Sequence, residues 1–183
     1  MNREGALDSI RANVESGNLV KHMLATEAIM RALARRFGED EEEWGLTGLL
    51  HDIDVELTQG DMSSHSKLGS DLVRELGASV AMAHAILCHN ERHGVACETK
   101  LDKALFCADP LTGLIIASAL VRPDKKLAGL EASSVRKKFK EKGFAAGANR
   151  EQIALCSEIG LGLDEFIVLG LEAMKEIAAD LGL

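Results

Sequence analysis

The feature that constrains this chain most is an adjacent histidine and aspartate, His51 and Asp52, at the end of an apolar segment. An imidazole nitrogen beside a carboxylate oxygen suits a divalent transition metal better than it suits a plain hydrophobic core. The pair is common by chance, but four more residues of these two types occur in predominantly apolar helical contexts: His22, His65, His89 and Asp109. This pattern predicts a site on several central helices.

The composition favours one all-α domain that covers residues 1–183. A chain of 183 residues can bury a full core, and 46% of its residues are hydrophobic. Aromatic residues make up only 3%, proline occurs twice, and helix-forming Ala, Leu, Glu and Lys abound. We therefore expect a compact bundle of seven or eight helices.

The net charge and the cysteine pattern argue against several classes of function and of metal site. A net charge of −8 argues against general binding to nucleic acid or to an anionic membrane. The four cysteines form no CxxC motif and lie mostly in apolar runs, so we expect buried free thiols rather than a zinc knuckle. Neither a signal peptide nor an apolar run of roughly 18 residues is apparent, and we expect a cytoplasmic protein.

Hydrophobic periodicity places the candidate residues on helices. The expected helices cover about 3–16, 19–37, 40–52, 65–76, 79–90, 99–121, 149–158 and 163–181. His22 shares an inward stripe with Thr26, Ile29 and Leu33, although a histidine on such a stripe can also be a core residue bonded to a carbonyl.

Three other candidates also have plain alternatives. His65, in the first turn of its expected helix, could be exposed to solvent. His84 and His89 lie about 140° apart around the expected helix 79–90, so they should not both bind the same ion. Asp109 precedes Pro110 and could cap a helix at a kink.

The ordered set His22, His51, Asp52, His65, His89 and Asp109 resembles the HD superfamily of metal-dependent phosphohydrolases. That family has the pattern H…HD…D, with extra histidines in members that hold two metals. The resemblance covers about residues 19–121, with local matches at Gly48–Ile53, at His65 followed by Gly69, at Ala85–His89 and at Leu101–Asp109. The spacing is similar to that of the bacterial dinuclear subgroup that cleaves diadenosine tetraphosphate symmetrically. Residues 122–183 would form a C-terminal helical extension.

The resemblance implies a site for one or two divalent ions of Fe, Mn, Co, Ni or Zn. The first ion would be held by His22, His51, Asp52 and Asp109, and a second by His65 and His89 with Asp52 as the bridge. Asp52 would thus be both ligand and catalytic residue. With one ion only, a nearby carboxylate such as Asp54 or Glu56 could orient the attacking water.

The implied activity is hydrolysis of a nucleotide or another small phosphate ester by a metal-activated water. A dinucleoside polyphosphate or a cyclic nucleotide is a narrower possibility. A metal- and nucleotide-binding sensor without catalysis is the alternative from another class. We expect a small phosphorylated partner and neither nucleic acid nor membrane, and the oligomeric state stays open.

Two departures from the family pattern leave the number of metal ions open. The frequent HDIGK form is HDIDV here, so Asp54 and Val55 replace a glycine and a lysine that could have faced phosphate. The His-His pair of some dinuclear members is His89-Asn90 here, which leaves one nitrogen ligand fewer.

The segment 122–150 has nine basic and three acidic residues, a local net charge of +6 in an acidic chain. A solvated basic helix face is the simple interpretation. The sharper one is a surface that attracts the phosphate of the substrate. On that interpretation the substrate-binding residues are Arg136, Lys137, Lys138 and Lys140.

Overall fold

The computed structural model describes all 183 residues and contains helices without strands, which confirms the all-α prediction. The helices are α1 (Arg3–Asn13), α2 (Gly17–Phe37), α3 (Glu41–Leu50), α4 (Lys67–Glu75), α5 (Val80–Cys88), α6 (Lys100–Leu120), α7 (Ala132–Lys140), α8 (Arg150–Ala154), α9 (Leu163–Glu176) and α10 (Ala178–Leu181), with 3-10 turns η1 (Glu91–His93) and η2 (Leu155–Ile159). The count exceeds eight because α7 forms within the basic segment and because α10, of four residues, is separate from α9.

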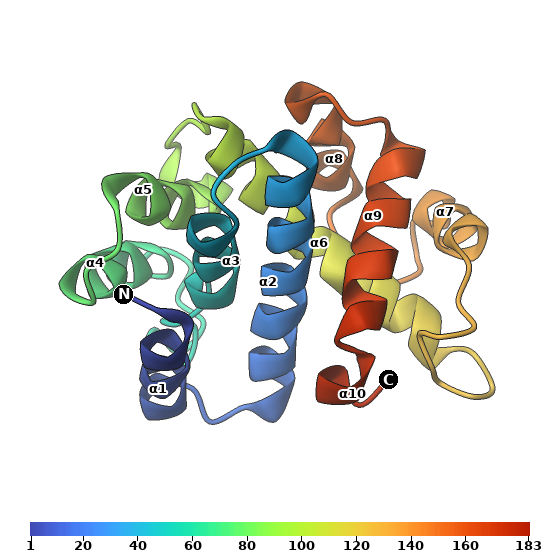
Figure 1. Cartoon of the computed structure of the whole chain (residues 1–183), viewed down its shortest axis with the longest axis horizontal. Helices are drawn as coiled ribbons and strands as arrows, with labels where there is room; N and C mark the ends of the chain where they lie inside the picture. The colour runs from blue at the N-terminus through green and yellow to red at the C-terminus, as the bar shows by residue number, and fades with distance from the viewer.

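Helix α6 is the centre of the bundle. It contacts α2, α3, α5, α7, α8 and α9, and in Figure 1 it crosses behind the neighbouring α2 and α9. One cluster of 42 buried hydrophobic residues runs from Ala6 to Leu181 and joins the early helices to the late ones. By length and hydropathy α6 could span a membrane, although we expected no segment of the chain to be apolar enough. However, 56% of its most apolar stretch is buried inside the protein.

The alternative in which Asp109 caps a helix at a kink before Pro110 is wrong, because α6 is continuous from Lys100 to Leu120. Proline removes one intrahelical hydrogen bond, which here is tolerated within a buried and well-packed helix. Asp109 is therefore an interior helical residue rather than a cap. Its carbonyl accepts a hydrogen bond of 2.7 Å from the Thr112 hydroxyl.

A glycine allows α3 to pack closely on α2. A Cβ atom at Gly48 would lie 2.8 Å from the backbone oxygen of Thr26 and 2.9 Å from the Met30 side chain. Only a residue without a side chain fits between the two backbones. This close approach brings His51, at the end of α3, next to His22 on α2.

One arginine holds the segment between α7 and α8. The Arg150 guanidinium donates hydrogen bonds to six backbone carbonyls: those of Lys138, Phe139, Glu141, Phe144, Ala145 and Ala148. Since residues 141–149 have no regular secondary structure, this side chain supplies partners that a helix would otherwise provide.

Candidate metal centre

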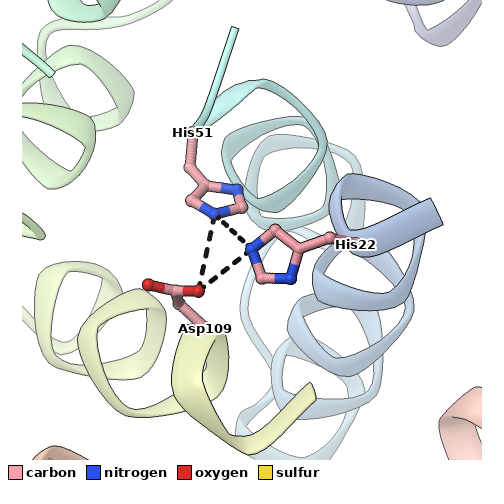
Figure 2. A group of neighbouring side chains, drawn as sticks. All are labelled: His22, His51 and Asp109. Carbon is pink, nitrogen blue, oxygen red and sulfur yellow. Dashed lines mark hydrogen bonds and ion pairs between the residues drawn. The ribbon is translucent and has the colours of Figure 1, made fainter. Parts of the chain in front are cut away.

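Three helices bring His22, His51 and Asp109 together at the middle of the bundle (Figure 2). The Nε2 atom of His22 lies 3.1 Å from Nε2 of His51 and 3.0 Å from Oδ1 of Asp109. The Nε2 atom of His51 lies 3.7 Å from the same oxygen. Donors bound cis at about 2.1 Å to one octahedral ion lie about 3.0 Å apart, so this arrangement fits a transition metal.

Asp52 faces two groups of histidines with its two oxygens. Its Oδ2 lies 3.3 Å from Nε2 of His51 and 3.4 Å from Nε2 of His22. Its Oδ1 lies 3.5 Å from Nε2 of both His65 and His89. The carboxylate could therefore bridge two ions, one beside His22 and His51 and the other beside His65 and His89.

The Nδ1 atoms of these histidines have partners behind the centre. Hydrogen bonds of 2.8 Å and 2.5 Å join Nδ1 of His51 to the Gly48 carbonyl and Nδ1 of His89 to the Ile86 carbonyl. Nδ1 of His22 donates to the Thr112 hydroxyl over 2.9 Å. Such bonds fix the tautomer and leave each Nε2 free to bind a metal.

Asp54 lies behind His65 rather than at the open face. The side chain is fully buried, and its Oδ1 accepts a hydrogen bond of 2.8 Å from Nδ1 of His65. Its Oδ2 accepts the backbone N–H groups of Ser66 and Gly69, each at 2.7 Å. With both oxygens engaged away from the cleft, Asp54 cannot orient an attacking water, and that expectation is wrong.

His65 itself is buried and precedes α4 instead of standing in its first turn. This placement contradicts the solvent-exposed alternative. The side-chain amide of Asn90 donates to the His65 carbonyl, 3.1 Å away, so the residue that replaces a second histidine supports the backbone of His65.

The carboxylates create a strong demand for positive charge. Burial lowers the pKa of His22, but hydrogen bonds to Asp109 and Asp52 outweigh it and raise the pKa to about 9. Burial likewise opposes a charge on His51, whose pKa is nevertheless raised by Asp52 and Asp109. The same histidines hold the pKa of Asp109 well below its usual range, although burial alone would raise it. A divalent cation would satisfy this demand in place of protons.

We expect the affinity for Mn²⁺ to rise with pH, because the ion must displace a proton from His22 until the pH reaches about 9. Each displaced proton corresponds to about tenfold in affinity per pH unit, and His51, whose pKa is also raised, can add a second proton to that of His22. In the metal-free protein, the charged His22 contributes stability that is complete below its ordinary pKa of 6.5 and is lost as the pH rises through about 9. Calorimetric titration between about pH 6 and 8 measures the first effect. An affinity independent of pH would contradict it.

A cleft of about 430 Å³ opens above the centre. Asp52, His65, His89 and Asp109 form its floor, and the walls include Asn90, Glu91, Arg92, Gly147, Asn149 and Gln152. Apart from the two histidines, the only basic side chain among the lining residues is that of Arg92. The wall formed by Gly147 and Asn149 belongs to the segment that Arg150 holds.

The structure does not bring Arg136, Lys137, Lys138 or Lys140 to this cleft. All four lie on α7, which packs on α6 and α9. Arg136 pairs with Asp164 over 2.6 Å, and Lys138 pairs with Glu141 over 2.8 Å. Their assignment as substrate-binding residues has no support in this structure, where α7 has a solvated basic face.

Sequence reasoning missed the polar walls of the cleft. Asn149 caps the start of α8, and its sequence signal is only that of an N-cap. Arg92 and Gln152 stand in polar surroundings that carry no distinctive pattern. Thr112, one turn after Asp109, became recognisable only when its hydroxyl was seen between His22 and the Asp109 carbonyl.

Comparison with known proteins agrees with this geometry. The family model described as "HD domain" matches residues 19–114, just over half of the chain, and spans His22 to Asp109. The chain belongs to the HD domain family. HD domain proteins as a family include metal-dependent phosphohydrolases, and the buried donors found here fit such a metal.

Curated relatives of this HD domain protein are more distant. It is 28% identical over 164 residues to Ribonuclease Y of Sulfurovum sp. (strain NBC37-1). The aligned region covers 87% of this chain and 32% of the relative. It is 26% identical over 169 residues to Ribonuclease Y of Geobacter metallireducens, covering 91% and 32%. The chain thus spans about a third of the length of these relatives. No solved structure matches it.

Proposed function

We propose that this HD domain protein is a metal-dependent phosphohydrolase that acts on a nucleotide or another small phosphate ester. The observation that carries the proposal is the position of Asp52 between two pairs of histidines, with one carboxylate oxygen directed at each pair. Asp109 completes the first set of donors. This arrangement supports two ions, and the second would have fewer protein ligands than the first.

Divalent ions at such a centre lower the pKa of a bound water and withdraw charge from the phosphate. The chain supplies the alignment. Asp52 would hold the two sites at a fixed separation, and Asp54 would keep the His65 ring in one orientation through its 2.8 Å bond to Nδ1. Asp54 is thus a positioning residue in this proposal.

The cleft supports a small substrate. Its volume of about 430 Å³ lies within the range of roughly 300–1,000 Å³ that small-molecule pockets occupy. The lining is mostly polar, with amides at Asn90, Asn149 and Gln152 and a guanidinium at Arg92. Amides can bond to base and sugar groups, and a guanidinium binds phosphate oxygens.

The test is turnover of a panel of mononucleotides, cyclic nucleotides and diadenosine tetraphosphate, with Mn²⁺ added and then removed by chelation. Metal-dependent release of phosphate or nucleotide from any of them supports the proposal. Tight binding of a nucleotide without turnover, with metal content confirmed by emission spectroscopy, would instead indicate a sensor.

A second candidate substrate is RNA, because the curated relatives bear the name Ribonuclease Y. The net charge of −8 and the single basic residue in the cleft apart from its histidines favour a small ester over a long anionic strand. Short RNA oligomers in the same panel decide between them, since a ribonuclease should prefer oligomers to mononucleotides by kcat/KM.

We expect Arg92→Ala to raise KM, because Arg92 is the only cationic side chain at the cleft. A hydrogen bond to a charged group contributes about 1.5–3 kcal/mol, which corresponds to roughly 10–150-fold in KM. Lys137→Ala and Lys140→Ala, on the basic face of α7, are matched controls that should leave KM unchanged. The reverse result would return the substrate site to α7.

A further inference from the structure

A second cluster of metal-binding side chain types lies between α5 and α6, apart from the centre around Asp52. His84 and Cys88 are one turn apart on α5, and Asp102 stands in the first turn of α6. One donor atom from each of these three residues lies within 4.8 Å of the other two. Cys97, between the helices, adds a thiol with its Sγ 3.4 Å from that of Cys88.

Asp102 has one carboxylate oxygen that the fold does not use. Its Oδ2 accepts the N–H groups of Glu98 and Thr99, at 3.0 and 2.8 Å, and caps α6. The same oxygen lies 3.0 Å from Nδ1 of His84. Its Oδ1 is buried and is the only buried side-chain nitrogen or oxygen in the protein without a hydrogen-bond partner. Leaving such an atom unpaired is costly, which indicates a missing ligand.

We propose that His84, Cys88, Cys97 and Asp102 bind a zinc-type ion as a structural site. Two thiolates, an imidazole and a carboxylate are donors that zinc accepts in tetrahedral geometry. With a Zn–S bond of about 2.3 Å, tetrahedral geometry sets two sulfurs about 3.8 Å apart. The observed 3.4 Å needs only a small expansion. The ion would also engage the unpaired oxygen of Asp102.

A disulfide between Cys88 and Cys97 would explain the arrangement of these four side chains less fully than a bound metal ion. The sulfurs would have to approach from 3.4 Å to about 2.05 Å, and the bond would leave Oδ1 of Asp102 without a partner. Metal binding involves all four side chains. A surface cavity of about 400 Å³ lined by both cysteines provides a path for the ion.

The place of the site in the fold suggests its role. The segment between Cys88 and Cys97 begins with His89 and contains Arg92, which lines the cleft. An ion bound to both cysteines would close this segment into a loop anchored on α5 and α6. It would thereby hold one rim of the cleft in place without taking part in hydrolysis.

Cobalt substitution tests the proposal, because only this site offers thiolate ligands to the ion. The metal-free protein loaded with Co²⁺ should show a near-ultraviolet thiolate-to-cobalt charge-transfer band, whereas the centre around Asp52 has only nitrogen and oxygen donors. Zinc analysis should find about one more equivalent per chain than the centre around Asp52 takes up. Absence of the band in the wild-type protein would overturn the proposal, as would a Cys88–Cys97 disulfide that persists in reductant.

Variants locate the band. Cys97→Ser should weaken it, and Cys88→Ser combined with Cys97→Ser should abolish it, while Cys107→Ser, which changes another cysteine outside the cluster, should retain it. His51→Ala should also retain the band, because it removes a ligand of the other centre. Loss of the band in His51→Ala, with circular dichroism unchanged, would assign the thiolate signal elsewhere and reject the site.

Discussion

Asp52→Ala is expected to empty both halves of the metal centre and to lower kcat/KM by about 10³-fold or more. The reason is that its two oxygens serve different histidine pairs, so one substitution removes a ligand from each ion. Changing a group behind the ligands already costs about 10–100-fold in metal affinity. Loss of a shared ligand should exceed that cost at both positions. Emission spectroscopy of the purified variant measures the metal, and the best substrate of the panel reports the activity.

Asp54→Asn is the matched comparison, since it changes a carboxylate that contacts only His65 among the histidines of the centre. Asparagine keeps the shape of the side chain and one acceptor oxygen. We expect a loss of about 10–100-fold in affinity for one ion and retention of the other. Equal metal loss in Asp54→Asn and Asp52→Ala, or full metal content in Asp52→Ala, would contradict the bridging role.

Gly48→Ala is expected to destabilise the fold strongly. Its Cβ would lie 2.8 Å from the Thr26 backbone oxygen, and a backbone atom cannot move aside as the end of a side chain can. Overpacking typically costs 1–3 kcal/mol, and we expect about 3 kcal/mol here. For a chain of this size that corresponds to a fall in Tm of about 6–12 °C. The separation of α2 from α3 should also draw His51 away from His22 and weaken metal binding.

Gly113→Ala provides the control for helix propensity. Gly113 is exposed on α6, and a Cβ atom there meets nothing within 4 Å. Alanine in a helix interior is about 0.5–1 kcal/mol more favourable than glycine. Its Tm should stay level or rise. A Tm for Gly48→Ala within a degree or two of the wild-type value would show that the α2–α3 contact can relax.

The sequence predicted correctly those features that depend only on the spacing of residues along a helix. Helical periodicity directed His22 inward, and the resemblance selected the six donors that the structure places around one point. The prediction that His84 and His89 serve different surroundings agrees with their positions, since His84 faces Asp102 and His89 faces Asp52. That residues 1–183 act as one HD-type domain remains a prediction.

Features that depend on the packing of distant segments were not accessible. Proximity in sequence suggested that Asp54 would face the substrate, yet the chain turns after α3 and directs this side chain backwards to His65 and the start of α4. A high density of lysine suggested an anion site on α7, but charge content does not reveal which side of the bundle a helix covers. The cleft wall comes instead from a weakly patterned segment further along.

The six carbonyls gathered by Arg150 have a consequence for motion. Residues 141–149 have few backbone hydrogen bonds of their own, so the Arg150 guanidinium supplies much of their order, together with the packing of Phe144, Ala145 and Ala148 against the core. Release of that one group would free the segment as a unit while α6 and α9 stay folded. Hydrogen exchange of amides in 141–149 should then proceed by local opening at one common rate, faster than in α6. The cleft wall that carries Gly147 and Asn149 would thus move away from the cleft whenever Arg150 releases the backbone carbonyls of the segment.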